Sequence, residues 1–158
     1  MAAPVASTRG VPAGTKLKDG YSTKIAFATA LTIAFWEKTV QPPGYDGGEP
    51  IENTTMHNTL WRTLRSRALL TATPHTVKAA YDPNCYSGIQ SLINVETTVT
   101  CSFPDGATLA FYGFLQKFEP DAHEEGKMPE ATVTVVPTNW DPVNQVEAGP
   151  TLTPHSGT

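Results

Sequence analysis

Apolar and polar positions alternate along several short stretches of this chain, as they do in strands that bury one face. The clearest alternation covers residues 96–103. Its two faces carry Thr97, Val99, Cys101 and Phe103 on one side, and Glu96, Thr98, Thr100 and Ser102 on the other. Pro104-Asp105-Gly106 comes next, followed by an apolar run over residues 109–118. Because proline presets φ at the first turn position and glycine supplies a positive φ at the exit, we predict a β-hairpin here.

Other stretches predict further strands and a single helix. Strands are expected around residues 24–27, 31–35, 77–81 and 131–135, where apolar residues alternate with polar or small ones. Asp82-Pro83 supplies a helix N-cap followed by proline at the first helical position. The apolar residues behind it fall at helical spacing: Tyr86, Ile89, Leu92 and Ile93. We therefore predict one short helix, from about Pro83 to Ile93.

The longest interruption of these patterns covers roughly residues 38–60. Strand pairing cannot continue through Pro42, Pro43 and Pro50, because proline has no ladder donor. An irregular connection of this length in a compact domain is usually functional or disordered. We predict a long inter-strand loop with a function of its own.

The two ends of the chain are rich in small and turn-forming residues. Residues 1–20 are predicted to be a flexible N-terminal arm, and residues 139–158 a C-terminal tail without periodicity. Residues 21–138 between them form one predicted domain. Hydrophobic residues make up 39% and charged residues 16% of the chain, with many threonines filling the difference. This composition favours a mainly β fold of the sandwich or barrel type, with one flanking α-helix.

The net charge of −4 is unevenly distributed. Residues 1–80 carry nine basic and five acidic residues, whereas residues 81–158 carry two basic and ten acidic ones. Such an asymmetry suggests complementary surfaces that meet between copies of the chain, although scattered solvated charge explains it equally well. At a pI near 5.5 a basic nucleic-acid-binding domain is not expected.

No catalytic, cofactor-binding or metal-binding site is predicted. The histidines occur singly, and Cys85 and Cys101 form no CxxC motif or Cys/His cluster. We expect both thiols to be free and synthesis to take place in a reducing cytoplasm. The start of the chain does not resemble a signal peptide, and no apolar run approaches membrane-spanning length, so membrane insertion is not expected. Arg62, Arg65 and Arg67 form the one basic cluster, which could contact phosphates but fits ion pairing to an acidic neighbour better.

Several stretches, in order along residues 20–139, resemble the major tail tube protein of lambda-like siphophages. They are Thr23-Lys24-Ile25-Ala26-Phe27, Ala34-Phe35-Trp36-Glu37-Lys38-Thr39-Val40-Gln41-Pro42-Pro43-Gly44, Thr55-Met56-His57-Asn58, Ala80-Tyr81-Asp82-Pro83, Phe103-Pro104-Asp105-Gly106, Tyr112-Gly113-Phe114-Leu115, Phe118-Glu119-Pro120 and Ala131-Thr132-Val133-Thr134-Val135-Val136-Pro137-Thr138-Asn139. No single stretch is diagnostic, and the resemblance rests on the ordered set.

This resemblance implies a structural protein of the virion tail, assembled in the cytoplasm of a bacterial host, and not an enzyme. Six copies would close into a ring, and rings would stack into a tube that conducts genomic DNA during ejection. The related tube of type VI secretion systems shares the fold that this resemblance implies. The implied partners are other copies of the chain, the tape measure protein, tail terminator and tail-tip or baseplate proteins, and double-stranded DNA in transient, non-specific passage. The alternative is a β-sandwich module of a virion that binds a receptor or a glycan, for which Trp36, Trp61 and Trp140 could serve.

Two sets of residues are assigned to assembly and to the wall of the conduit. The assembly loop is predicted to contain Val40, Pro42, Pro43, Gly44, Tyr45, Ile51, Met56 and His57. The wall of the lumen is predicted to be polar and uncharged to acidic, with Thr98, Thr100, Thr132 and Thr134 as candidates. Threonine maintains strand geometry and offers hydroxyls to water, and a wall without lysine or arginine denies DNA phosphates the contacts that drive non-specific binding.

Overall fold

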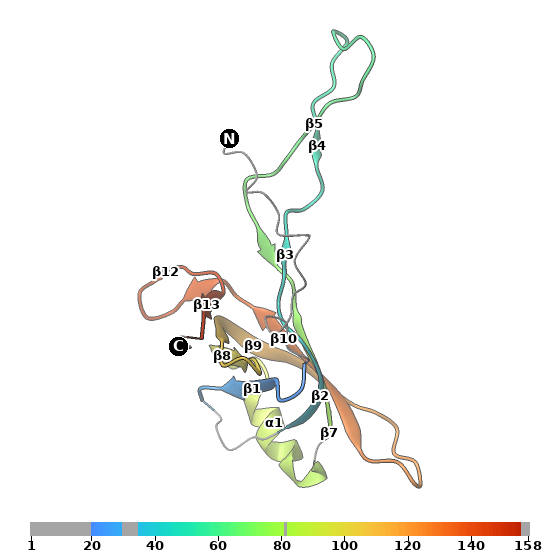
Figure 1. Ribbon diagram of the computed structural model, residues 1–158, viewed down its shortest axis with the longest axis vertical. Coiled ribbons are helices and arrows are strands. Elements are labelled where there is room, and N and C mark those ends of the chain that lie inside the picture. Colours follow the sequence, from blue (N-terminus) through green and yellow to red (C-terminus); the bar gives the residue numbers. More distant parts are fainter. Residues whose placement is uncertain (1–19, 30–34, 81, 156–158) are drawn as a thin grey trace.

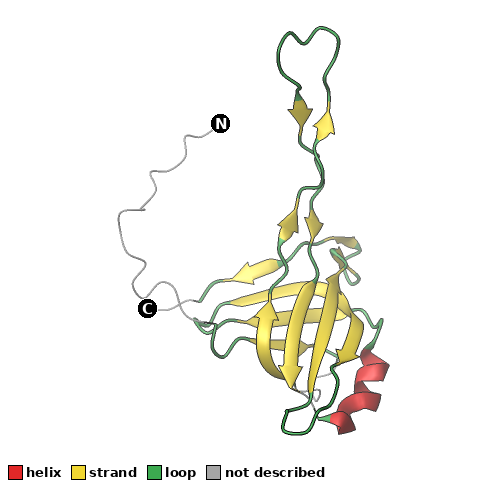
Figure 2. Ribbon diagram, turned by 90° about the vertical axis from the view of Figure 1, so that its right-hand side faces the viewer, coloured by secondary structure: helices red, strands yellow, loops and turns green. Residues whose placement is uncertain are grey.

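A curled antiparallel sheet with one helix at its side makes up the body of the protein, and a long hairpin projects from it (Figures 1 and 2). The computed structural model describes residues 20–29, 35–80 and 82–155. The mainly β fold with a single flanking helix, predicted from composition and alternation, is confirmed. Residues 1–19 of the predicted N-terminal arm and residues 31–34 of a predicted strand lie outside the described residues.

The main sheet has the strand order β1-β8-β9-β10-β7-β2, and a short strand, β13, adds to β9. Its strands are β1 Lys24–Phe27, β2 Trp36–Gln41, β7 His75–Ala80, β8 Thr97–Ser102, β9 Thr108–Pro120, β10 Glu130–Pro137 and β13 Thr151–Thr153. The first half of β9 pairs with β8 and its second half with β10. The end strands β1 and β2 come close together, because the Ile25 amide donates a 3.0 Å hydrogen bond to Glu37 Oε1.

The core lies inside the curl of this sheet. Alternate residues of β7, β8, β9 and β10 point into it, as the alternation in the sequence predicted for β7, β8 and β10; β9 was expected only as an apolar run. The largest fully buried side chains of the core include Phe27, Phe111 and Leu115. The predicted β-hairpin is also confirmed, since Gly106 has φ of 89° and the Phe103 amide donates to the Ala107 carbonyl at 2.9 Å.

The predicted helix is present but is divided into two pieces. A 3₁₀ turn, η2, covers Pro83–Cys85 and is capped by Asp82, whose Oδ1 accepts the Asn84 amide at 2.9 Å. The α-helix α1 then covers Tyr86–Leu92. Ile89 and Leu92 are the buried residues of α1, so this helix closes one side of the core.

The structure corrects two details of the predicted chain organisation. The predicted loop at 38–60 begins too early and ends too early, because residues 38–41 belong to β2 and the excursion lasts from residue 42 to residue 74. It contains paired strands, β3 Tyr45–Asp46 with β6 Thr71–Ala72, and β4 Ile51–Glu52 with β5 Leu64–Arg65. Residues 139–155, for which no periodicity was found, contain β11 Trp140–Asp141 and β12 Val146–Glu147, which pair with each other, and β13.

Candidate functional site

Residues 42–74, which we call the projecting hairpin, extend far beyond the body of the protein (Figures 1 and 2). The hairpin begins where Pro42 and Pro43 end the pairing of β2 with β7, since neither proline can donate a ladder hydrogen bond. Gly44 and Thr73 then join its two limbs. The Gly44 amide donates to Thr73 Oγ1 at 2.7 Å, and the Thr73 amide donates to the Gly44 carbonyl at 3.0 Å.

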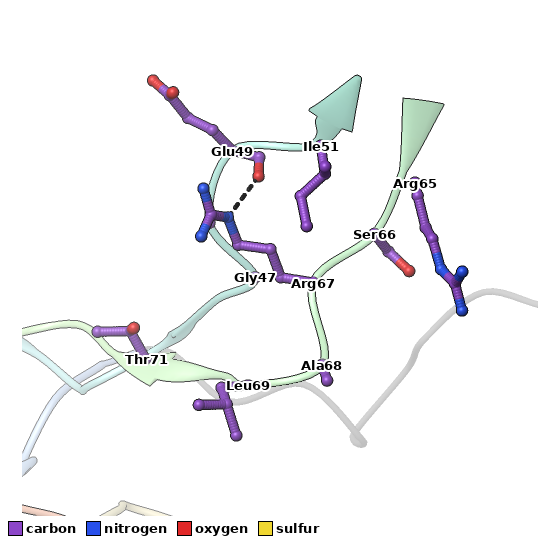
Figure 3. A pocket seen from close by; sticks show the side chains of 10 residues that line it. Gly47, Glu49, Ile51, Arg65, Ser66, Arg67, Ala68, Leu69 and Thr71 are labelled. Atoms are coloured by element: carbon purple, nitrogen blue, oxygen red, sulfur yellow. Dashed lines mark hydrogen bonds between the residues drawn. The ribbon is translucent and has the colours of Figure 1, made fainter. Parts of the chain in front are cut away.

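The limbs separate between the two short ladders and meet again toward the tip. Gly47 and Gly48 lie in this interval, facing residues 66–69, and the opening between the limbs has a volume of about 780 Å³ (Figure 3). Beyond it the tip is ordered by polar contacts. Asn58 Oδ1 accepts the Thr55 amide at 2.9 Å, and Asn58 Nδ2 donates to the Trp61 carbonyl at 2.9 Å. Hydrogen bonds therefore fix the shape of the tip, while its apolar side chains remain outside.

The projecting hairpin exposes an unusual number of large apolar side chains. Met56 is fully exposed at 101%, and Trp61 is 77% and Leu69 81% exposed. The other members of this set are also largely exposed: Tyr45, Ile51, Leu60, Leu64 and Leu70. Since exposed apolar side chains that gather on one element mark interaction sites in soluble proteins, the hairpin has the character of an interaction surface.

Its charged residues are arranged across the two limbs. Arg62 Nη1 lies 3.3 Å from Glu52 Oε1, and Arg67 Nε donates to the Glu49 carbonyl at 2.7 Å. The side chain of Arg65 has neither an ion pair nor a hydrogen bond with the described residues, and its guanidinium points away from the opposite limb (Figure 3). The predicted pairing of the basic cluster with acidic neighbours is therefore present within the hairpin at Arg62. Such an exposed pair contributes at most about 1 kcal/mol.

The residues predicted for the assembly loop fall into two groups. Val40 is in β2 and packs against the core. The other predicted residues are in the outgoing limb and at the tip: Pro42, Pro43, Gly44, Tyr45, Ile51, Met56 and His57. The return limb, with Leu64, Leu69 and Leu70, was not predicted, because its leucines have neither strand nor helix periodicity. Their occurrence among threonines and arginines was the available signal.

The four threonines predicted for the lumen lie on the face of the sheet that points away from the core. Thr98 and Thr100 alternate with buried Val99 and Cys101 in β8. Thr132 and Thr134 alternate with buried Val133 and Val135 in β10. All four are half-buried, and their cross-strand neighbours include Tyr112, Ala110, Lys78 and Lys117. Around Thr98 and Thr100 these neighbours are uncharged, whereas Thr132 and Thr134 lie beside Lys78, Lys117 and Glu119. The assignment of this threonine face to a lumen stays a prediction.

Several groups that could react are held in unreactive surroundings. Cys101 is buried, and burial raises the pKa of its thiol to about 11, with a smaller contribution from the charge of Glu37. Cys85 is half-buried and also free. Within residues 20–29, 35–80 and 82–155, no group of three or more histidine, cysteine or acidic residues is arranged to hold a metal ion. In the same part of the chain, no helix has the length and apolar character needed to span a membrane.

Comparison with solved structures identifies chains of similar fold. One is from the virion of a native gene transfer agent particle, with 10% identity and a TM-score of 0.60 over 87% of this chain and 99% of that chain. Another is from the baseplate of the anti-feeding prophage, with 7% identity and a TM-score of 0.55 over 84% and 91%. A third is from the tail of an empty gene transfer agent particle, with 9% identity and a TM-score of 0.48 over 77% and 84%.

No family model matches the sequence, and no curated protein does. The structural likeness covers nearly the whole of the first two neighbours, but at these identities it concerns the fold alone. This chain has the fold of chains found in the virion of a gene transfer agent and in the baseplate of the anti-feeding prophage.

Proposed function

We propose that this chain is a structural subunit of a phage-type tail, in which six copies form a ring and the rings stack into a tube that conducts DNA during ejection. The observation that carries the proposal is the projecting hairpin. It displays Met56, Trp61 and Leu69 to water but has a fixed backbone, so it is built to be covered by another molecule. A second copy of the chain is the partner that a self-assembling tube supplies.

The fold and the surface chemistry support this proposal. The two neighbours with TM-scores above 0.5 come from a virion and from a baseplate that was described with six-fold symmetry. A contact between different surfaces of identical subunits gives a ring when its rotation closes and a filament when it does not, and a tube needs one contact of each kind. The β8 part of the threonine face, Thr98 and Thr100, offers hydroxyls with uncharged cross-strand neighbours, which is a suitable lining for a conduit that DNA must leave quickly.

A tube of this kind needs further partners. We expect a tape measure protein in the lumen during assembly, and terminator and tip or baseplate proteins at the two ends of the tube. A receptor- or glycan-binding module is less well supported, because the tryptophans do not gather around one pocket. Trp61 is at the tip of the hairpin, Trp36 begins β2 at the other end of the sheet, and Trp140 is in β11.

The test removes the hairpin while preserving its base. Asp46 pairs with Thr71, so replacing residues 47–70 with Asn-Gly would close a two-residue turn on an existing ladder. We expect this variant to fold with an unchanged melting temperature but to form no tubes in negative-stain images of concentrated protein. A matched control, Val143→Ser, removes an exposed apolar side chain outside the hairpin and should leave tube formation intact. Normal tubes from the shortened variant would contradict the proposal.

A further inference from the structure

The projecting hairpin and the connection between β9 and β10 lie at opposite ends of the molecule (Figure 1). The strand register defines these ends. The hairpin leaves the sheet where Gln41 pairs with Thr76. At the other end of the same strands, Ala80 pairs with Trp36 on one side and with Glu130 on the other. Residues 121–129 and the start of α1 adjoin that second end.

We call this second end the far-end surface and define it by six exposed or partly exposed residues: Trp36, Tyr86, Asp121, Glu124, Glu125 and Met128. Trp36 is 60% and Met128 63% exposed. Met128 lies with Asp121 and Glu124 along a shallow depression of about 400 Å³ that Lys38 closes on the β2 side. The far-end surface therefore combines large apolar side chains with carboxylates.

The carboxylates of the far-end surface are only partly neutralised. Lys78 Nζ lies 3.2 Å from Asp121 Oδ2, and Lys127 pairs with Glu124. Glu125 is exposed and has no ion pair with the described residues. With Glu130, which pairs with Lys38 and Lys78, this end holds four carboxylates against three lysines, so one negative charge is in excess. The return limb of the hairpin carries exposed Leu69 and Leu70, and Arg65, whose side chain has no ion pair with the described residues. The two surfaces match in both charge and apolar character.

The length of the hairpin determines which part of it can meet the far-end surface. An extended limb advances about 3.3 Å per residue, so residues 42–57 can project up to roughly 50 Å. A body of about 100 residues has a radius of gyration near 13 Å, which corresponds to a diameter of about 33 Å. When copies stack along the long axis, the tip therefore passes along the flank of the next copy. The middle of the hairpin, from the β3–β6 ladder to the β4–β5 ladder, then lies against its far end.

We propose that the return limb of the projecting hairpin, residues 64–70, docks on the far-end surface of the next copy in the stack. Leu69 and Leu70 cover Trp36 and Met128, and Arg65 faces the carboxylates of residues 121–125. The contact joins different surfaces of identical chains, so it repeats without closing and sets the direction of the tube. This inference rests on the proposed function and adds the surface that receives the hairpin.

The direct test maps the contact in assembled tubes. A photoreactive benzoylphenylalanine is placed in place of Leu69, the tubes are irradiated, and cross-linked peptides are identified by mass spectrometry. We expect a cross-linked dimer whose second peptide contains residues 121–130 or 35–38. The same group in place of Val143 is the control and should give no cross-link to that peptide. Cross-links from position 69 to the threonine face, or to any other surface, would overturn the inference while leaving the tube itself intact.

Charge reversal provides an independent measurement on the same interface. Arg65→Glu should raise the protein concentration needed for tube formation by about tenfold, because it places like charges together at every junction. Adding Glu125→Arg to this variant should restore most of the loss, whereas adding Glu147→Arg, an exposed charge in β12, should not. Tube formation by Arg65→Glu at the wild-type concentration would contradict the predicted contact. Failure of the unmodified chain to form tubes would instead defeat the proposed function, and the inference with it.

Discussion

At the scale of single residues, His75 is an unusual component of the core. Its side chain is 0% exposed, neither ring nitrogen has a hydrogen-bond partner among the described residues, and its ring packs edge-on to Phe111 with centroids 5.8 Å apart. Burial lowers the pKa of His75, and the nearby backbone of Gln41 opposes this only in part. The folded protein therefore holds a neutral imidazole directly at the base of the projecting hairpin.

We predict that stability decreases between pH 7.5 and pH 5.5 because of His75. Below the unfolded-state pKa of about 6.5, the unfolded chain binds a proton at His75 that the folded core resists. The free energy of unfolding therefore becomes smaller as the pH falls. Above that pH the imidazole is neutral in both states and the penalty is absent. The urea midpoint of the wild type should fall across this range, and that of His75→Leu should fall less. His57→Gln, on the exposed hairpin, should behave as the wild type.

Gly113 is a second constrained position. It lies in β9 where the pairing changes from β8 to β10, and it is a partner of both Thr97 and Pro137. A Cβ at this position would lie 2.6 Å from the Val136 carbonyl oxygen, which is backbone and cannot rotate away. We predict that Gly113→Ala lowers the free energy of unfolding by about 1–3 kcal/mol. Gly149→Ala meets no atom within 4 Å and should change stability by less than about 0.5 kcal/mol in the same denaturation experiment.

At the scale of elements, helix α1 closes the side of the core that the curled sheet leaves open. Ile89 is 1% and Leu92 4% exposed, and the next residue, Ile93, bridges to Leu115 of β9. The remaining residues of the helix, apart from these two, are exposed. The helix therefore contributes to stability mainly through one pair of side chains.

We predict that Ile89→Ala lowers the free energy of unfolding by about 2–5 kcal/mol, because it leaves a cavity between the helix and the sheet. Gln90→Ala, one position along on the exposed side, should alter it by less than about 0.5 kcal/mol. Equal effects of the two substitutions in thermal or urea unfolding would show that α1 is not an integral cover of the core.

At the scale of the whole molecule, the threonine face and the exposed hairpin divide two tasks between different surfaces. The hairpin and the far-end surface would join copies along the stack, and the threonine face would meet the lumen. The two tasks are separable by mutation, because Thr98 and Thr100 lie in β8, away from the hairpin.

We predict that Thr98→Lys combined with Thr100→Lys leaves tubes intact but slows DNA ejection, because lysines in the wall would bind phosphates as DNA passes. Added salt should relieve the defect, because the release of counterions from DNA stabilises binding less when the salt concentration is high. Ser87→Lys with Ser91→Lys, on the exposed side of α1, places the same charge elsewhere and is the control. Virions of the β8 variant that eject DNA at the wild-type rate in low salt would exclude a lumen role for this strand.

The sequence by itself determined the local structure of this protein. Alternation in β8 and β10 identified both the buried side chains and the opposite threonine face, since strand side chains point to the two faces in turn. The turn at Pro104-Asp105-Gly106 and the helix start at Asp82-Pro83 followed from backbone preferences of the residues present. These features depend on neighbours within a few positions, so a single sequence contains the information for them.

Only the tertiary structure decided how these pieces pair and which apolar residues stay outside. The proline- and glycine-rich excursion was recognisable, but its return limb was not, because Tyr45 pairs with Ala72 across a long stretch of chain without periodicity. The position of β13 beside β9, and the placement of Trp36 and the projecting hairpin at opposite ends of the sheet, likewise follow from long-range register. Alternation shows which face of a strand is buried, whereas the choice of partner strand and the exposure of Leu69 depend on contacts between residues that are distant in sequence.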